Sequence, residues 1–318
     1  MKIIRVEELS NPIRLDKYLK KEINDVSREK IIHSIKEGKI KIEGKTKIKP
    51  SFILKGGEKI LFEIPDFLTL TRELPSIRPQ SVFPEPKILY EDKDLLIIDK
   101  PAGIIVHPTV NNINNPSIAS WFLQKNPFVS NVGEDQLRPG IVHRLDKETS
   151  GTLILAKNNF IFNYLKNLFK TRKIKKKYIA LVKGEIKKQE GMIDLPLTRS
   201  KKSPTKRKVV IKKDKGKIAL TKYKVLKLYN GYTLLEIFPQ TGRTHQIRVH
   251  LAAIGFPVVG DKLYGYKKKD RNLINISCHF LHAQEISFVL SSGELIKAEA
   301  PLPEDLRKAL QCLKPKVD

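Results

Sequence analysis

The sequence predicts an α+β fold, in which a mostly antiparallel or mixed sheet with flanking helices follows a small N-terminal α/β module. Segments with the apolar or alternating patterns of strands outnumber helical patterns, and many strands with few helices favour this class. Four prolines, which remove backbone donors and favour extended chain, lie between residues 66 and 87: Pro75, Pro79, Pro84 and Pro86. We therefore divide the chain into a module over 1–65, a linker over 66–87 and a larger domain over 88–318.

The N-terminal module carries signals for two helices, a strand and two turns. Residues 14–19 start one helix, and Ser27 would be the N-cap of a second helix that Gly38 ends. The buried face of this second helix would carry Ile31, Ile32 and Ile35. Residues 40–42 alternate Ile with Lys and predict a short strand, while residues 43–44 and 56–57 mark turns.

The larger domain resumes regular structure at Ile88 with several strand patterns. Continuous apolar runs over 95–98, 104–106 and 152–156 predict buried strands. Residues 221–225 and 232–236 alternate cleanly and predict half-buried strands.

Two helices are expected in this domain. The first starts at Asn158, because apolar residues repeat at helical spacing and would form core: Phe160, Ile161, Tyr164, Leu165, Leu168 and Phe169. The basic segment 170–177 would close it. The second spans about 244–254, with Thr244 as N-cap and Gly255 followed by Pro257 as its end.

The chain carries a strong positive charge. Its 61 basic and 34 acidic residues give a formal net charge of +27 and a pI near 9.9. Such an excess favours polyanion binding through phosphate contacts and counterion release, although part of the lysine excess can be compositional. Basic residues concentrate in 170–177 and 199–217, and a run of this kind alone is as often plain solvated surface. Together with the net charge, the two runs favour a nucleic acid as partner.

A membrane partner or a secreted location fits the sequence less well than a nucleic-acid partner. No apolar run approaches the roughly 20 residues that span a bilayer, so we expect no membrane contact. The first residues lack the apolar stretch of a signal peptide, and Cys278 and Cys312 do not make a disulfide framework. We expect a cytoplasmic monomer.

Familiar catalytic and metal templates are missing. The chain has no P-loop, no GxGxxG after a strand and no Gly-x-Ser-x-Gly elbow. His245 and His250 are five residues apart and lack the Glu of a helical zinc motif. His279 and His282 could share a helix face, but no Cys or carboxylate cluster joins them. We expect no metal.

Three polar segments embedded in apolar sequence remain as candidates for chemistry: 100–108, 143–151 and 241–250. The first holds Pro and Gly of a tight turn, for which a structural role is the simpler interpretation. The second places Asp146 among His143, Arg144 and Lys147 in a turn before a buried strand. Loops on a rigid scaffold often carry chemistry, although a lone Asp in a turn is usually a cap or a salt bridge.

The N-terminal module resembles the S-four RNA-binding module over about residues 13–64. The resemblance rests on Arg14-Leu15-Asp16-Lys17-Tyr18-Leu19, the Ser-Arg pair at 27–28, residues 35–44 and the Gly-Gly at 56–57. Glu43-Gly44 stands where Asn-Gly is more frequent, and Gly57-Glu58 where Gly-Asp is. The resemblance implies helices that contact RNA through Arg14, Lys17, Arg28 and Lys30.

The larger domain resembles the large-ribosomal-subunit type of RNA pseudouridine synthase. Its motifs occur in order: Pro101-Ala102-Gly103 with His107-Pro108, 143–151, Lys177-Tyr178-Ile179-Ala180 with Gly184, and 241–250 with Gly260-Asp261 and Tyr264-Gly265. The match covers roughly 88–300, so most of the chain is included. It implies isomerisation of uridine to pseudouridine in large-subunit ribosomal RNA or its precursor, without metal or cofactor.

The resemblance also implies roles for individual residues. Asp146 matches the catalytic Asp, Arg248 the basic residue paired with it, and Tyr178 the Tyr that packs on the target base and is a candidate for proton transfer. Ile247 matches an apolar residue lining the pocket, and Arg144 the residue that displaces or replaces the flipped base. Three further residues of segments 143–151 and 241–250 are expected to bind the substrate: His143, Arg243 and His245.

Some features depart from the family pattern, and other functions stay open. Phe256 stands where many members have His, and the stretch 278–283 lacks the usual Arg-Gln pair before Leu-His-Ala. A non-catalytic RNA-binding ribosome-assembly factor would share the charge and the N-terminal module without needing Asp146, Tyr178 and Arg248 together. A nucleic-acid hydrolase is disfavoured by the missing acidic metal cluster.

Overall fold

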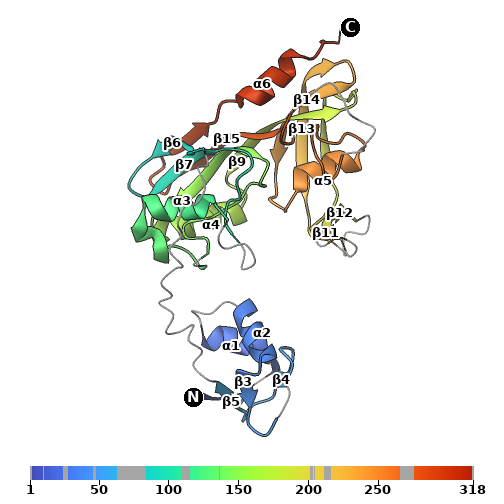
Figure 1. Ribbon diagram of the computed structural model, residues 1–318. Helices are drawn as coiled ribbons and strands as arrows, with labels where there is room; N and C mark the ends of the chain where they lie inside the picture. The colour runs from blue at the N-terminus through green and yellow to red at the C-terminus, as the bar shows by residue number, and fades with distance from the viewer. Residues whose placement is uncertain are drawn as a thin grey trace. The chain divides into compact units, whose positions relative to one another are not determined.

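A computed structural model describes residues 2–9, 11–23, 28–45, 48–62, 84–108, 115–135, 137–200, 203, 205–210, 216–265 and 276–316. The chain divides into two compact units, Met1–Arg78 and Pro79–Asp318 (Figure 1). Of the expected linker over 66–87, all but residues 84–87 lie outside the described residues, as does the expected N-cap Ser27.

The N-terminal unit contains two helices and short antiparallel strands around one apolar core. Its helices are α1 (Leu15–Glu22) and α2 (Arg28–Lys36), and its strands are β1 (Lys2–Arg5), β2 (Ile13–Arg14), β3 (Ile40–Ile42), β4 (Ile53–Leu54) and β5 (Lys59–Phe62). Strands β1, β5 and β3 form one sheet, and β2 pairs with β4. The two expected helices and the strand at 40–42 are confirmed, and Gly38, at φ 73°, follows the end of α2.

The second unit is built on one large mixed sheet. In the described residues its strand order is β10-β13-β14-β9-β15-β8-β7-β6, with β16 paired to β15. The strands are β6 (Lys87–Glu91), β7 (Leu95–Lys100), β8 (Ser150–Ala156), β9 (Lys175–Lys183), β10 (Glu190–Asp194), β13 (Leu220–Tyr229), β14 (Tyr232–Pro239), β15 (Leu281–Val289) and β16 (Leu295–Glu299). Neighbours pair antiparallel except β8 and β15, which run parallel. The expected α+β class with a mixed sheet is confirmed.

Helices and a strand pair flank this sheet (Figure 1). The helices are α3 (Ile118–Lys125), a 3-10 turn over Pro127–Asn131, α4 (Asn159–Lys170), α5 (Gln246–Ala253) and α6 (Glu304–Gln311). Helix α4 packs near β8 and α5 near β13, so two apolar cores lie along one sheet. A separate antiparallel pair, β11 (Leu197–Arg199) and β12 (Arg207–Val209), lies against α5. We call it the β11–β12 pair.

The expectation that helix α4 starts after Asn158 is confirmed. The Asn158 side chain accepts a hydrogen bond from the Ile161 amide at 3.0 Å, which caps the helix. Ile161 and Leu165 are buried in the core as expected, whereas Phe160 is 71% exposed. The aromatic stripe is therefore only partly core.

One expected strand and two expected helix ends are wrong. Residues 104–106 are not a strand, because their carbonyls accept hydrogen bonds from other groups: Lys100 Nζ, Ile118 N and Ala119 N. Segment 170–177 does not close α4, since the helix ends at Lys170, the chain turns through Arg172 at φ 60° and β9 begins at Lys175. Helix α5 begins at Gln246 rather than Thr244, and its N-cap is His245.

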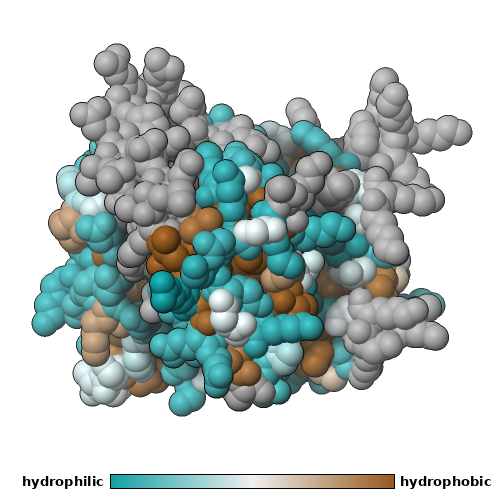
Figure 2. All heavy atoms as spheres, turned by 90° about the horizontal axis from the view of Figure 1, so that it is seen from below, coloured by the Kyte–Doolittle hydropathy of each residue, from teal (hydrophilic) through white to brown (hydrophobic). Residues whose placement is uncertain are grey.

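Figure 2 shows one face on which hydrophilic residues surround small apolar areas. In the described residues, no helix has the length and apolar character needed to cross a membrane.

Candidate active site

A cleft of about 600 Å³ brings together all eight residues that were expected in a site of the larger domain. Its lining comes from the loop before β8, the turn from α4 to β9, and the segment from the end of β14 into α5. The eight residues are Asp146, Tyr178, Arg248, Arg144, Ile247, His143, Arg243 and His245.

Asp146 lies in the loop before β8, and hydrogen bonds hold the backbone of this loop at Asp146 and at the next residue. The Asp146 carbonyl accepts a hydrogen bond from the Thr149 amide at 3.1 Å. The next carbonyl, of Lys147, accepts from the Gly103 amide at 2.9 Å and from Lys100 Nζ at 3.2 Å. Lys100 is fully buried and also donates to the carbonyls of Pro101 and Ile104. The segment that starts with Lys100 therefore holds the loop that presents Asp146.

The parallel pairing of β8 with β15 places the other end of this loop. Gly151, at φ 112°, lies so close to β15 that a Cβ there would stand 2.2 Å from the Ala283 carbonyl oxygen. Thr149 Oγ1 lies 2.8 Å from His279 Nε2, and Ser150 Oγ lies 2.9 Å from His282 Nδ1. The spacing of His279 and His282 allowed a shared helix face, but neither residue is in a helix. His282 is in β15, and His279 just precedes that strand.

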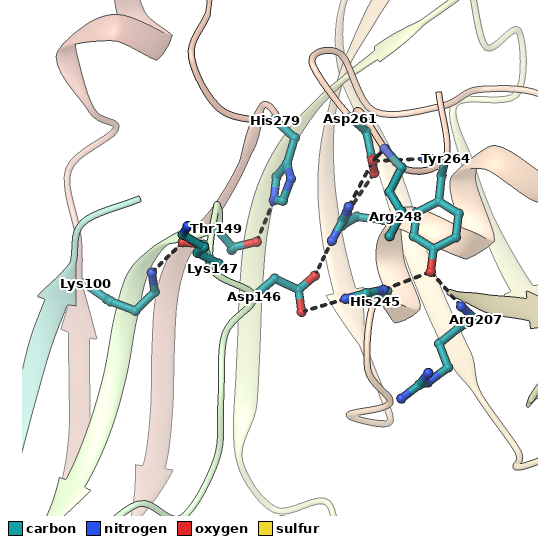
Figure 3. Close-up of polar contacts among 11 residues, drawn as sticks. Lys100, Asp146, Lys147, Thr149, Arg207, His245, Arg248, Asp261, Tyr264 and His279 are labelled. Atoms are coloured by element: carbon teal, nitrogen blue, oxygen red, sulfur yellow. Dashed lines mark hydrogen bonds and ion pairs between the residues drawn. The ribbon is translucent and has the colours of Figure 1, made fainter. Parts of the chain in front are cut away.

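Arg248 connects two carboxylates at the centre of the cleft (Figure 3). Its Nε and Nη2 donate to the two oxygens of Asp261 at 2.7 and 2.9 Å, and its Nη1 donates to Asp146 Oδ2 at 2.8 Å. Arg248 and Asp261 are buried, while the Asp146 side chain keeps 16% of its surface exposed to the cleft. The buried Asp261 thus fixes the guanidinium, which donates one hydrogen bond from Nη1 to the partly exposed Asp146.

The surroundings of Arg248 and Asp261 favour the charged form of both groups. Burial alone would lower the pKa of Arg248, but the hydrogen bonds to Asp261 and the charge of Asp146 outweigh it and raise that pKa. Burial would likewise raise the pKa of Asp261, but Arg248 and the amides of Leu263 and Tyr264 lower it below its usual value. Arg248 and Asp261 therefore form an ionised buried pair near neutral pH.

Helix α5 is fastened by polar residues from the same motif that carries Arg248. Gln246 accepts from Thr241 Oγ1 and from the Arg243 amide, and its Nε2 donates to the Leu220 carbonyl at 3.0 Å. His250 lies with one ring nitrogen 2.9 Å from Thr221 Oγ1 and the other 2.9 Å from the Leu195 carbonyl. Gln246 and His250 thus hold the helix on β13, which fixes the position of Arg248.

Tyr178 and Ile247 form apolar walls of the cleft. Tyr178 is half-buried in β9 and packs against both cores, while Ile247 is buried at the start of α5. Burial, and to a lesser degree the charge of Asp146, raise the pKa of the Tyr178 phenol above its usual value. The hydroxyl therefore stays protonated at neutral pH.

The side chains of the other residues expected to bind substrate differ in how many protein contacts they make. The exposed Arg144 makes no side-chain hydrogen bond or ion pair with the residues that the structure describes. Arg243 donates from Nε to the Ile218 carbonyl at 3.1 Å, and so helps to hold the chain entering β13. His143 accepts from the Ile154 amide at 2.9 Å and packs its ring on Phe169, and burial lowers its pKa to about 3. Within this set, Arg144 has the freest side chain.

His245 belongs to a second polar chain that reaches Asp146 from the other side. Its backbone is left-handed at φ 58°, an uncommon conformation for a residue with a Cβ that often occurs at functional sites. Its Nε2 lies 3.9 Å from Asp146 Oδ1, and its Nδ1 lies 2.8 Å from the hydroxyl of Tyr264. Burial lowers the pKa of His245, so the ring is neutral at neutral pH.

The basic residues of the N-terminal unit have two kinds of surroundings. Arg14 and Arg28 both donate to the fully buried Asp16, at distances from 2.7 to 3.2 Å, with 41% and 46% of their side-chain surface exposed. They therefore brace the fold of this unit as well as charging its surface. Lys17 is exposed on α1, and the side chain of Lys30 lies outside the described part of the structure.

Sequence reasoning left three residues of the site without a role. Asp261 and Tyr264 were part of the family pattern only, and Lys100 belonged to a segment interpreted as structural. A Gly-Asp pair after a helix carries no local sign that its Asp will be buried against an arginine. In the described part of the chain, no three His, Cys, Asp or Glu side chains are grouped as metal ligands would be.

Comparisons with known proteins agree with one another. Residues 94–253 match the family model described as RNA pseudouridylate synthase. An uncharacterized RNA pseudouridine synthase from Aquifex aeolicus is 38% identical over 94% of this chain and 93% of its own. A ribosomal large subunit pseudouridine synthase D from Borreliella burgdorferi is 34% identical over 92% of this chain and 87% of its own. The solved structure of human RNA pseudouridylate synthase domain containing 1 is 26% identical and superimposes with a TM-score of 0.58 over 74% of this chain and 92% of that chain.

Proposed function

Since the chain belongs to the RNA pseudouridylate synthase family, whose members isomerise uridine in RNA, we propose that Asp146 carries this reaction in the cleft and that the substrate is large-subunit ribosomal RNA. The observation that supports the first part best is the geometry of Arg248. It is clamped by Asp261 and directs its Nη1 at the one carboxylate of the triad that is exposed to the cleft.

The reaction has to break one bond to the sugar and form another. The bond from uracil N1 to ribose C1′ breaks, the uracil turns, and a bond from C5 to C1′ forms. The hydrogen on C5 leaves as a proton and N1 gains one, so the product is an isomer of the substrate. Asp146 serves either as the nucleophile that attacks the sugar or as the base that removes a ribose proton. Both routes use a carboxylate, and Arg248 Nη1 donates a hydrogen bond to it.

Other residues of the cleft fit the remaining needs of this reaction. The target base must leave its stack, which costs a few kcal/mol. The Tyr178 ring offers a stacking face, and its hydroxyl can relay the C5 proton by passing on its own proton as it accepts that one. Arg144 has a free guanidinium on the cleft and can fill the gap that the base leaves or hold a phosphate.

The RNA class is supported by the relatives and by the charge of the chain. Several relatives are named ribosomal large subunit pseudouridine synthase D, at 34–35% identity over most of the chain. The two helices and the strand at 40–42 of the N-terminal unit lie within the stretch that resembles an S-four module, and we propose that this unit contacts RNA through Arg14, Lys17, Arg28 and Lys30. The net charge of +27 fits a partner rich in phosphate.

A substitution at Asp146 tests the assignment. The Asp146→Asn chain is incubated with a large-subunit ribosomal RNA transcript, and pseudouridines are mapped by chemical adduct formation and primer extension. We expect no product and RNA affinity within about twofold of wild type. Asp305→Asn, on the first turn of α6 and outside the cleft, is the matched control and should keep full activity. Substantial product from Asp146→Asn would overturn the role of Asp146, and an inactive wild type that still binds the RNA would favour an assembly factor.

A further inference from the structure

The hydroxyl of Tyr264 contacts both the β11–β12 pair and a histidine that lines the cleft. On one side it lies 2.8 Å from the backbone amide of Arg207, the first residue of β12. On the other side it lies 2.8 Å from His245 Nδ1, whose ring reaches towards Asp146 (Figure 3). Tyr264 follows Asp261 on the loop that also clamps Arg248.

The direction of these hydrogen bonds follows from the groups present. A backbone N–H can only donate, so the Tyr264 oxygen accepts from Arg207. The phenol has a single hydrogen of its own, and His245 Nδ1 is the acceptor within reach of it. A neutral imidazole carries one hydrogen, which is then on Nε2 and faces the Asp146 carboxylate. The opposite tautomer would turn a lone pair towards that carboxylate, so both ends of the ring favour the same arrangement.

Arg207 belongs to a basic surface next to the cleft. The described residues of the β11–β12 pair and its turn include four cationic side chains: Arg199, Lys206, Arg207 and Lys208. The chain that leaves this pair is held at the cleft a second time, because Arg243 donates to the Ile218 carbonyl. A phosphate that docks on these cations therefore acts on backbone that is hydrogen-bonded to the catalytic cleft.

We propose that Tyr264 is a positioning residue that couples the seating of the β11–β12 pair to the tautomer of His245, and through it to Asp146. This inference rests on the proposed role of Asp146. Tyr264 does not touch the substrate in this scheme. Its hydroxyl holds the imidazole so that Nε2–H points at the carboxylate, and it does so best when the Arg207 amide is in place.

The tautomer can be read directly by NMR, independently of activity. The full chain is labelled with ¹⁵N-histidine, and the His245 signals are assigned by their loss in His245→Gln. We expect Nδ1 of His245 to resonate as an unprotonated ring nitrogen and Nε2 as a protonated one. A wild-type His245 with its hydrogen on Nδ1 would overturn the proposal, whatever any variant does.

Tyr264→Phe then tests the coupling while keeping the ring. We expect both His245 nitrogens to move to averaged shifts, the Arg207 amide to lose protection from hydrogen exchange, and kcat to fall about 3- to 10-fold with KM and RNA affinity unchanged. Tyr164→Phe is the matched control, because the Tyr164 hydroxyl also bonds to backbone, 2.9 Å from the Val289 carbonyl, but lies outside the cleft.

Two results with Tyr264→Phe would refute the coupling. One is an unchanged His245 tautomer, and the other is a changed tautomer with wild-type kcat. A failure of the proposed function is distinguishable from both, because it would appear as product formed by Asp146→Asn while the NMR result stands.

Discussion

Asp261→Asn should destabilise the larger unit strongly, although Asp261 is not expected to touch the substrate. The substitution keeps Oδ1, which accepts from Arg248 Nη2 and from the amides of Leu263 and Tyr264. It replaces Oδ2, the acceptor of the 2.7 Å bond from Arg248 Nε, with an NH₂ group. Two donors then face each other in a buried site, and the negative charge that balances Arg248 from behind is gone.

The size of the effect follows from the burial of the pair. Breaking a buried ion pair by removing one partner costs about 3–5 kcal/mol. Asp146 remains as a counter-charge and Oδ1 keeps its bonds, so we expect the lower end, about 3 kcal/mol. For a unit of this size each kcal/mol lowers Tm by about 2–4 °C, which predicts a fall of about 6–12 °C.

Urea and thermal unfolding of wild type, Asp261→Asn, Arg248→Met and the double variant measure this. In the Arg248→Met background no guanidinium needs a counter-charge, so adding Asp261→Asn should lower the free energy of unfolding by less than about 1 kcal/mol. The effects of the two substitutions should therefore be strongly non-additive. The Asp305→Asn variant controls for loss of an exposed Asp and should unfold as wild type does. A single-variant loss below about 1 kcal/mol, or additive effects, would refute the clamp.

Two further predictions concern pH and salt. Burial lowers the pKa of Lys100 to about 7, against the opposing charges of Glu148 and Asp146. Above pH 7 the folded chain should therefore release a proton that the unfolded chain keeps to about 10.5, and the neutral amine then has N–H groups for only two of the three carbonyls that the ammonium contacts. This contribution to stability is complete above pH 10.5 and is lost as the pH falls to 7. Relative to Lys100→Met, the wild-type free energy of unfolding should therefore rise between pH 7 and 9 by up to about 1.4 kcal/mol per pH unit in urea titrations, and a constant difference would show that Lys100 stays charged. RNA affinity should fall steeply with salt in filter-binding assays. Replacing Lys206 and Lys208 by Ala should lower the slope of log affinity against log salt by up to about 0.7–0.9 for each phosphate that is no longer neutralised, whereas an unchanged slope would remove these lysines from the RNA surface.

Strands β7 and β8 and the Asp146 loop could be predicted from the sequence because their signals are local. The run 152–156 is apolar throughout and forms β8, and Asp146 stands in the turn before it. The start of α5 was placed wrongly because the Gln246 side chain binds the Arg243 amide, a contact that appears only once α5 lies on β13. Local patterns cannot show such tertiary hydrogen bonds.

The members of the site came mainly from the family resemblance, whereas their connections required the structure. Arg248 could be paired with Asp146 by resemblance, but its clamp on Asp261 depends on how the loop after α5 folds back on the helix. In the N-terminal unit, Arg14 and Arg28 were expected only to contact RNA, because nothing in the sequence shows that Asp16 is buried beside them. Burial of a polar side chain is a property of the assembled core.

The parallel pairing of β8 with β15 has a consequence for how the protein becomes active during synthesis. It joins Ser150 to His282, which are 132 residues apart, while Arg248 is 102 residues from Asp146. Contacts between such distant segments form late in folding, because closing a long loop has to precede them. A nascent chain that ends before β15 lacks the strand against which the Asp146 loop is seated. The basic N-terminal unit, which we propose contacts RNA, is therefore fully synthesised well before the cleft can be completed.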